Sequence, residues 1–92
     1  MIKLTGYIDI PEERHAEIAA ALPIHIALTR AEPGCVKFEV VPDQNTQGRY
    51  LVSELFTTQD AFDAHQARVR ASDWGRITAG IPREYKIETT ED

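Results

Sequence analysis

Two residues of this sequence suggest acid–base chemistry: a glutamate in an apolar strand and a histidine in the segment that follows. Residues 49–57 are typical of a β-strand, in which side chains alternate between two faces. Glu54 therefore shares a face with Val52 and Phe56. A carboxylate on such a face is costly unless another group pairs with it. The next segment begins a helix and presents His65 within reach of that face.

A buried carboxylate near an imidazole is a common way to build an acid–base site. We therefore expect His65 to remove a proton from a phenol or an enol, with Glu54 as its orienting partner. The resulting electron-rich anion could react with oxygen without a metal or a flavin, or it could be reprotonated elsewhere. The structural alternative is that the two residues only pair to fix the helix on the sheet.

Aromatic residues could shape a pocket for a flat ligand next to this pair. The candidates for contacting a substrate are Trp74, Phe62, Tyr7 and Tyr50. Aromatic side chains at such spacing serve equally well as plain core. Arg30 is expected to pair with Glu32 or to cap a helix end.

A metal site is the other chemistry that these residue types allow. Two histidines and a carboxylate, here His25, His65 and Glu54, can form a facial iron site. None of the three is linked to another by short local spacing, so we expect neither a metal nor another cofactor. Cys35 is the single cysteine, which excludes an internal disulfide and a cysteine-rich zinc site.

Size and composition limit the remaining possibilities. The chain has 92 residues, 42% of them hydrophobic, and a net charge of −5. This length predicts one domain over residues 1–92, with more apolar material than a small monomer easily buries. Without a concentrated basic patch, nucleic-acid binding is not expected. Without a long apolar run, neither a signal peptide nor a membrane span is expected, so we predict a cytoplasmic protein.

The periodicity of apolar residues predicts the elements that position these side chains. The expected elements are a strand at 2–10, a helix from Pro11 to about residue 32, strands at 35–41 and 49–57, a helix capped by Thr58, a short helix at 72–80 capped by Ser72, and a strand at 83–89. The inner face of the first helix is expected to consist of Ile18, Ala21, Leu22, His25, Leu28 and Thr29. Pro23 should kink this helix or divide it. In the second strand, Val36, Phe38 and Val40 are expected on one face.

The order of these elements is β-α-β-β-α-β, the ferredoxin-like α+β pattern of one antiparallel sheet with helices on one face. The other sheet face stays open, and apolar residues of the third strand lie on it. An exposed apolar sheet face usually marks an interface. We therefore expect a homodimer in which two sheets pack through their open faces.

Three local sequences resemble the antibiotic biosynthesis monooxygenase (ABM) family of dimeric α+β-barrel proteins. They are His25 followed by Thr29-Arg30-Ala31-Glu32-Pro33-Gly34-Cys35 and Phe38, then Tyr50-Leu51-Val52-Ser53-Glu54-Leu55-Phe56, and then Asp60-Ala61-Phe62-Asp63-Ala64-His65. They span residues 25–65, and the flanking strands fit as well.

The resemblance implies a pocket between the sheet and the helices, with His25, Glu54 and His65 as its polar groups. It gives His25 the role of a hydrogen-bond donor to a substrate oxygen. Members include cofactor-free oxygenases of quinols and aromatic polyketides, haem-degrading enzymes and a sugar isomerase. The chain lacks the second histidine that members often carry after the position of His65, and it has no asparagine on the first strand, which disfavours the haem-degrading branch.

These observations together predict a cofactor-independent monooxygenase whose partners are oxygen and a small aromatic or quinol-type substrate. The alternatives are an isomerase or lyase that uses the same proton abstraction, and a non-catalytic ligand-binding or stress-response dimer.

Overall fold

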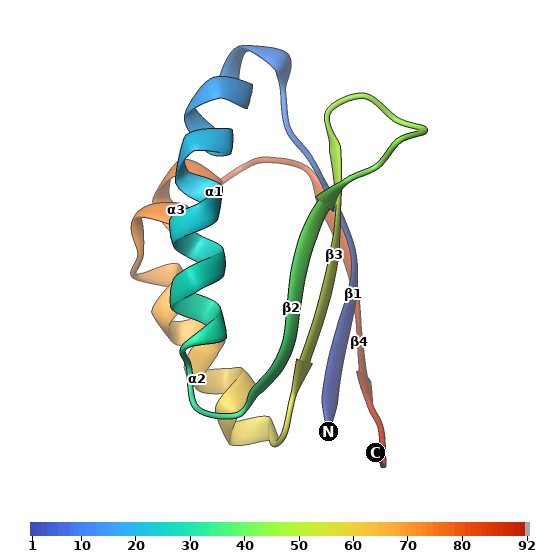
Figure 1. Cartoon of the computed structure of the whole chain (residues 1–92), viewed down its shortest axis with the longest axis vertical. Coiled ribbons are helices and arrows are strands. Elements are labelled where there is room, and N and C mark those ends of the chain that lie inside the picture. Colours follow the sequence, from blue (N-terminus) through green and yellow to red (C-terminus); the bar gives the residue numbers. More distant parts are fainter. Residues whose placement is uncertain (92) are drawn as a thin grey trace.

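The computed structural model describes residues 1–91, which form one four-stranded sheet covered on one face by helices (Figure 1). In chain order the elements are β1 (Ile2–Asp9), the 3₁₀ turn η1 (Glu12–Arg14), α1 (His15–Arg30), β2 (Cys35–Pro42), β3 (Arg49–Phe56), α2 (Gln59–Arg70), α3 (Asp73–Ile77) and β4 (Arg83–Thr89). The strands are ordered β2-β3-β1-β4, and all neighbours are antiparallel. This confirms the expected ferredoxin-like α+β fold.

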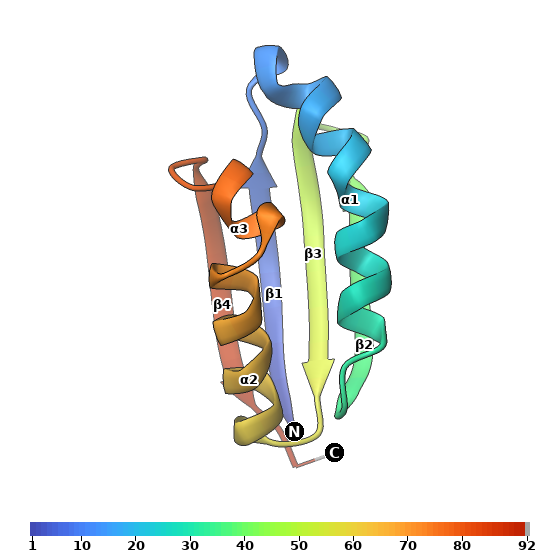
Figure 2. The same cartoon turned by 90° about the vertical axis from the view of Figure 1, so that its left-hand side faces the viewer.

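The helices form a second layer on one side of the sheet, with α1 alongside α2 and α3 (Figure 2). The inward residues of β1 are Ile2, Leu4 and Ile8, and all three are buried. They meet buried apolar residues of the helices, such as Ile18 and Phe62, in one continuous core. The opposite face of the sheet carries no helix within residues 1–91, as expected (Figure 1).

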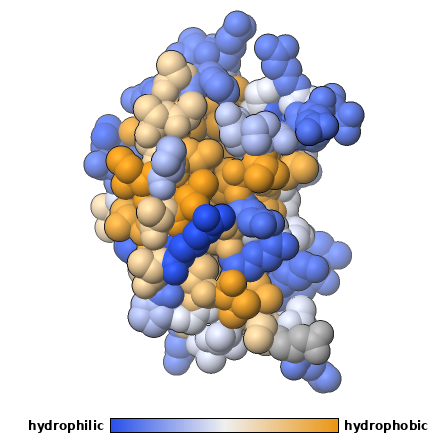
Figure 3. Space-filling view, in the orientation of Figure 1, coloured by the Kyte–Doolittle hydropathy of each residue, from blue (hydrophilic) through white to orange (hydrophobic). Residues whose placement is uncertain are grey.

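Helix α1 differs from the sequence expectation in two respects. It continues unbroken from His15 to Arg30 through Pro23, so the proline does not divide it. Leu28, which was expected on the inner face, is 51% exposed, and Ile24 is 65% exposed beside it. Apolar side chains consequently reach the surface over α1 (Figure 3).

A β-bulge explains a third difference. Strand β2 pairs with β3 through Cys35 opposite Phe56 and Lys37 opposite Leu55, so Val36 is an extra residue between the two pairs. A bulge interrupts the alternation of side chains along a strand. Val36 is therefore exposed, although Phe38 and Val40 beyond the bulge are buried as predicted.

Both expected helix caps are present, and they fix where the later helices begin. The Thr58 hydroxyl accepts a hydrogen bond from the backbone N–H of Ala61 at 3.1 Å, which starts α2. The Ser72 hydroxyl accepts one from Gly75 at 3.1 Å and starts α3. Such caps satisfy N–H groups that the first turn of a helix leaves unpaired. They fix the residues at which the helices that carry His65 and Trp74 begin.

Candidate functional site

A cavity of about 70 Å³ lies between the sheet and the helical layer. Its walls come from all four strands and all three α-helices. They consist of Leu4, Ile8, His25, Phe38, Val40, Val52, Glu54, His65, Gln66, Val69, Trp74, Arg83 and Tyr85. The fold therefore brings the three predicted catalytic residues, His25, Glu54 and His65, to one cavity.

Glu54 points inward from β3 and is only 7% exposed. Strand alternation places it there between Val52 and Phe56, as the sequence predicts. Its Oε1 is buried and has no hydrogen-bond partner among residues 1–91. Burial, and to a lesser degree the negative charge of Glu32, raises the pKa of Glu54 to about 7. This carboxyl group can therefore gain or lose a proton near neutral pH.

His65 lies on the inner face of α2, is 3% exposed and stands between two carboxylates. Its Nε2 is 3.6 Å from Glu54 Oε1, so the predicted proximity of the two residues is confirmed. Its Nδ1 is 2.7 Å from Glu32 Oε1, which is a hydrogen bond. The hydrogen-bonded partner of His65 is thus Glu32, whereas the sequence analysis gave this orienting role to Glu54.

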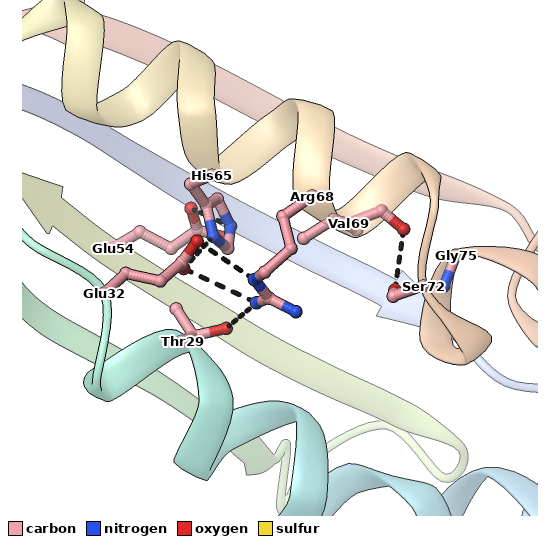
Figure 4. A network of polar contacts seen from close by, with 8 residues as sticks. All are labelled: Thr29, Glu32, Glu54, His65, Arg68, Val69, Ser72 and Gly75. Carbon is pink, nitrogen blue, oxygen red and sulfur yellow. Dashed lines mark hydrogen bonds and ion pairs between the residues drawn. The ribbon is translucent and has the colours of Figure 1, made fainter.

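Glu32 occupies the turn between α1 and β2 and links His65 to a cation (Figure 4). Arg68 Nε donates to Glu32 Oε2 at 3.0 Å, and another guanidinium nitrogen of Arg68 donates to Thr29 Oγ1 at 3.0 Å. Burial alone would raise the pKa of Glu32, but the hydrogen bonds from Arg68 and His65 outweigh it and hold that pKa below its usual range. Glu32 is accordingly an ionised carboxylate at neutral pH.

The pKa of His65 reflects a balance of two opposed effects. Burial lowers it, and the hydrogen bond to Glu32 raises it by less. The net direction is downward, so His65 is neutral at pH 7 and can accept a proton.

His25 faces the cavity from α1 and is 6% exposed. Its ring stacks on the indole of Trp74, with ring centroids 4.6 Å apart and planes 6° apart, and the edge of Phe38 packs against it. Burial lowers the pKa of His25 to about 4, which keeps the ring neutral. Its buried Nδ1 has no hydrogen-bond partner within the described part of the chain. This nitrogen is available to a polar group in the cavity.

Of the four predicted substrate-contacting residues, only Trp74 lines the cavity. Phe62 is buried, and its ring packs edge-on against Phe56 in the core. Tyr50 lies near the start of β3, away from Glu54, and its hydroxyl is 3.0 Å from His15 Nε2. Both residues therefore support the fold away from the cavity walls.

Tyr7 is on the wrong side of the sheet for the predicted role. Its hydroxyl donates to Glu84 Oε2 at 2.9 Å, and the guanidinium of Arg49 lies 3.6 Å from its ring centroid. These contacts belong to the open face, because Tyr7 alternates with the inward residue Ile8. Arg30 also differs from expectation, since its guanidinium donates to the Phe38 carbonyl at 2.9 Å instead of pairing with Glu32.

Two structural findings concern other classes of function. Across residues 1–91, no three side chains of histidine, cysteine, aspartate or glutamate are grouped so that they could hold a metal ion. Within the same residues, none of the helices has the length and apolar character needed to cross a membrane.

The fold and the cavity define a ferredoxin-like α+β protein with ionisable groups buried under its helices. The family model described as antibiotic biosynthesis monooxygenase matches residues 1–76. The chain therefore belongs to the antibiotic biosynthesis monooxygenase family, as its motifs suggested. No curated protein has a detectably similar sequence.

Solved structures agree with this fold. A candidate antibiotic biosynthesis monooxygenase from Nitrosomonas europaea aligns with a TM-score of 0.81 at 17% identity, covering 100% of both chains. Another candidate, from Deinococcus radiodurans, gives a TM-score of 0.80 at 18% identity over 100% of this chain and 94% of its own. SnoaB, a cofactor-independent oxygenase from Streptomyces nogalater, aligns with a TM-score of 0.74 at 15% identity, covering 99% of this chain and 93% of its own. At these identities the likeness concerns the fold alone.

Proposed function

We propose that this chain is a cofactor-independent monooxygenase that acts on a small aromatic or quinol-type substrate. One observation carries the proposal: a neutral histidine lines the same cavity as His25 and Glu54, and each of these two has a buried polar atom with no hydrogen-bond partner among residues 1–91. Unpaired buried polar groups cost free energy, so a fold retains them where a ligand or water satisfies them. Membership of the family supports oxygen as the second reactant.

In the proposed reaction, a substrate hydroxyl or acidic C–H gives its proton to His65 Nε2. The imidazolium that forms lies between the carboxyl groups of Glu32 and Glu54, which stabilise it. The substrate anion then reduces oxygen and bonds to one of its atoms. The second oxygen atom leaves as water with the two hydrogens that the substrate loses. His25 Nδ1 contacts the substrate oxygen, and general-base catalysis of this kind contributes about 10²–10⁴-fold.

The size of the cavity restricts the substrate. A dry cavity of about 150 Å³ holds benzene, and this cavity measures about 70 Å³. A single aromatic ring therefore enters only if a wall residue moves. Trp74 and Val69 are the half-buried apolar residues of that wall. A one-ring substrate requires the smallest displacement, and each further ring requires a larger one.

The decisive experiment follows the oxygen atoms. Metal-stripped protein is incubated with reduced quinols and anthrones under ¹⁸O₂, and in parallel without oxygen. One labelled oxygen atom in each product molecule supports the proposal. Turnover without oxygen would instead show an isomerase or lyase, and ligand binding without turnover would show a non-catalytic module.

We also propose that the open sheet face pairs with a second copy of this chain. Val41, Leu51 and Tyr7 are aligned across β2, β3 and β1 on that face, and both Val41 and Leu51 are exposed. Both signs of charge surround this row, which suits a two-fold interface in which each surface meets itself. The charged residues of the face include Lys37, Glu39, Arg49, Glu84 and Lys86.

A further inference from the structure

The contacts of His65 raise the question of what decides which of its two nitrogens is the base. The imidazole has a carboxyl group at each side, Glu32 at Nδ1 and Glu54 at Nε2. The other ionisable groups near it are Arg68 on α2 and His25 on α1, whose ring centroid is 6.5 Å away. A neutral imidazole carries one proton, and the stronger acceptor takes it.

We propose that Glu32 is a positioning residue that holds the His65 proton on Nδ1 and leaves Nε2 as the base facing the cavity. The contact of 2.7 Å at Nδ1 is within hydrogen-bond range, whereas the 3.6 Å at Nε2 is beyond it. Glu32 is also the carboxyl group that stays ionised, and an ionised carboxylate only accepts hydrogen bonds. Both differences favour the proton on the Glu32 side.

Arg68 holds the Glu32 carboxylate in place beside His65. It donates to Glu32 from Nε at 3.0 Å and from a second nitrogen at 3.4 Å, and it is anchored to the buried Thr29 at 3.0 Å. The shorter Arg68 bond reaches Glu32 Oε2, and the longer one reaches Oε1, the oxygen that also faces His65 Nδ1 (Figure 4). The acceptor that it presents to Nδ1 cannot turn away without breaking these bonds.

The substitution Glu32→Gln should reverse the tautomer. Arg68 donates to both oxygens of Glu32, at 3.0 Å to Oε2 and at 3.4 Å to Oε1, so the oxygen of the new amide should take the Oε2 position, where an amide N–H would face the closer donor. The amide NH₂ then faces His65 Nδ1 and donates to it. The proton of His65 moves to Nε2, next to Glu54, and the nitrogen that faces the cavity can no longer act as a base.

The catalytic consequence of this inference rests on the proposed function, but its structural content is tested without any substrate. ¹⁵N NMR of imidazole-labelled protein at pH 7 shows which ring nitrogen of His65 carries the proton. We expect Nδ1–H in the wild type, Nε2–H in Glu32→Gln and a return toward Nδ1–H in Glu32→Asp. Glu13→Gln, at an exposed position in η1, is the control and should leave the spectrum of His65 unchanged.

The spectra also separate the two proposals. A wild-type protein with the proton on Nε2, or a folded Glu32→Gln variant that keeps it on Nδ1, overturns the role of Glu32. The wild-type measurement decides the question even if Glu32→Gln does not fold. If the tautomers behave as expected but no substrate is oxidised, the proposed function fails and the positioning by Glu32 stands. On a proven substrate, Glu32→Gln should lower kcat by about 10²–10⁴-fold with little change in KM.

Discussion

Replacing Glu54 with glutamine should stabilise the protein above pH 7. The carboxyl group is 7% exposed, its Oε1 is unpartnered within residues 1–91, and its pKa rises from the usual 4.5 to about 7 on folding. Each pH unit between those two values corresponds to about 1.4 kcal/mol. Ionising Glu54 in the folded chain therefore costs about 3 kcal/mol relative to the unfolded chain.

The sign follows from the number of bound protons. Between pH 4.5 and 7 the folded chain keeps the Glu54 proton while the unfolded chain releases it. Raising the pH through this range therefore lowers the free energy of unfolding, and above pH 7 the full cost is present. A neutral glutamine of the same shape removes this cost. Glu54→Gln should match the wild type near pH 4.5 and exceed it by about 3 kcal/mol at pH 8.

His25 also changes how the stability of the wild type depends on pH. It is present in both proteins, so it does not change the stability difference between Glu54→Gln and wild type. Its pKa falls from 6.5 to about 4 on folding, so the unfolded chain binds more protons between these values. Stability consequently rises with pH over the range in which Glu54 makes it fall. The lowered pKa of His65 acts in the same direction as that of His25, so between pH 4.5 and 6.5 the stability of the wild type should rise less steeply than that of Glu54→Gln.

Urea unfolding at half-unit steps from pH 4.5 to 8, at one fixed protein concentration, measures this difference. Glu13→Gln, which changes an exposed glutamate, is the matched control and should track the wild type. A stability difference between Glu54→Gln and wild type that stays constant over this range would refute the claim that folding buries a carboxylate at an energetic cost.

Three further predictions concern the cavity, the open face and a helix cap. Val69→Ala shortens a side chain of the wall and enlarges the cavity, so it should raise kcat/KM for a two-ring substrate relative to a one-ring substrate in competition assays. Leu51→Lys places a charge in the apolar row of the open face and should shift a dimer to monomer in analytical ultracentrifugation, whereas Ala20→Lys on the exposed side of α1 should not. Thr58→Ala removes the cap of α2 and should lower the free energy of unfolding by about 1 kcal/mol in urea titrations.

Local sequence rules predicted the fold and the positions of most site residues. Strand alternation has a period of two, so it placed Glu54 on the inner face correctly. The same rule separates Tyr7 from the inward residue Ile8, so alternation alone excludes Tyr7 from a pocket under the helices. The exposed Val36 shows where strand alternation fails, because the bulge adds one residue to β2 and no local sequence pattern predicts it.

The contact between Glu32 and His65 could not be predicted in this way. The two residues are 33 positions apart, and Glu32 lies in a turn whose sequence, Glu32-Pro33-Gly34, is explained fully as a helix stop. They come together only because the tertiary fold places α1 and α2 over the same face of the sheet (Figure 2). A weak signal exists in Arg68, which follows His65 by three positions on one helix face and can serve the same carboxylate.

We propose that His65 is the base of an oxygen-consuming reaction that needs no cofactor. Oxygen uptake by metal-stripped protein on quinols and anthrones tests it directly, with the wild type, His65→Ala and the exposed-site control His15→Ala assayed side by side. We predict uptake above the autoxidation rate in the wild type and in His15→Ala, and a loss of about 10²–10⁴-fold in folded His65→Ala. A substrate that the wild type oxidises and that His65→Ala oxidises equally fast would contradict this account.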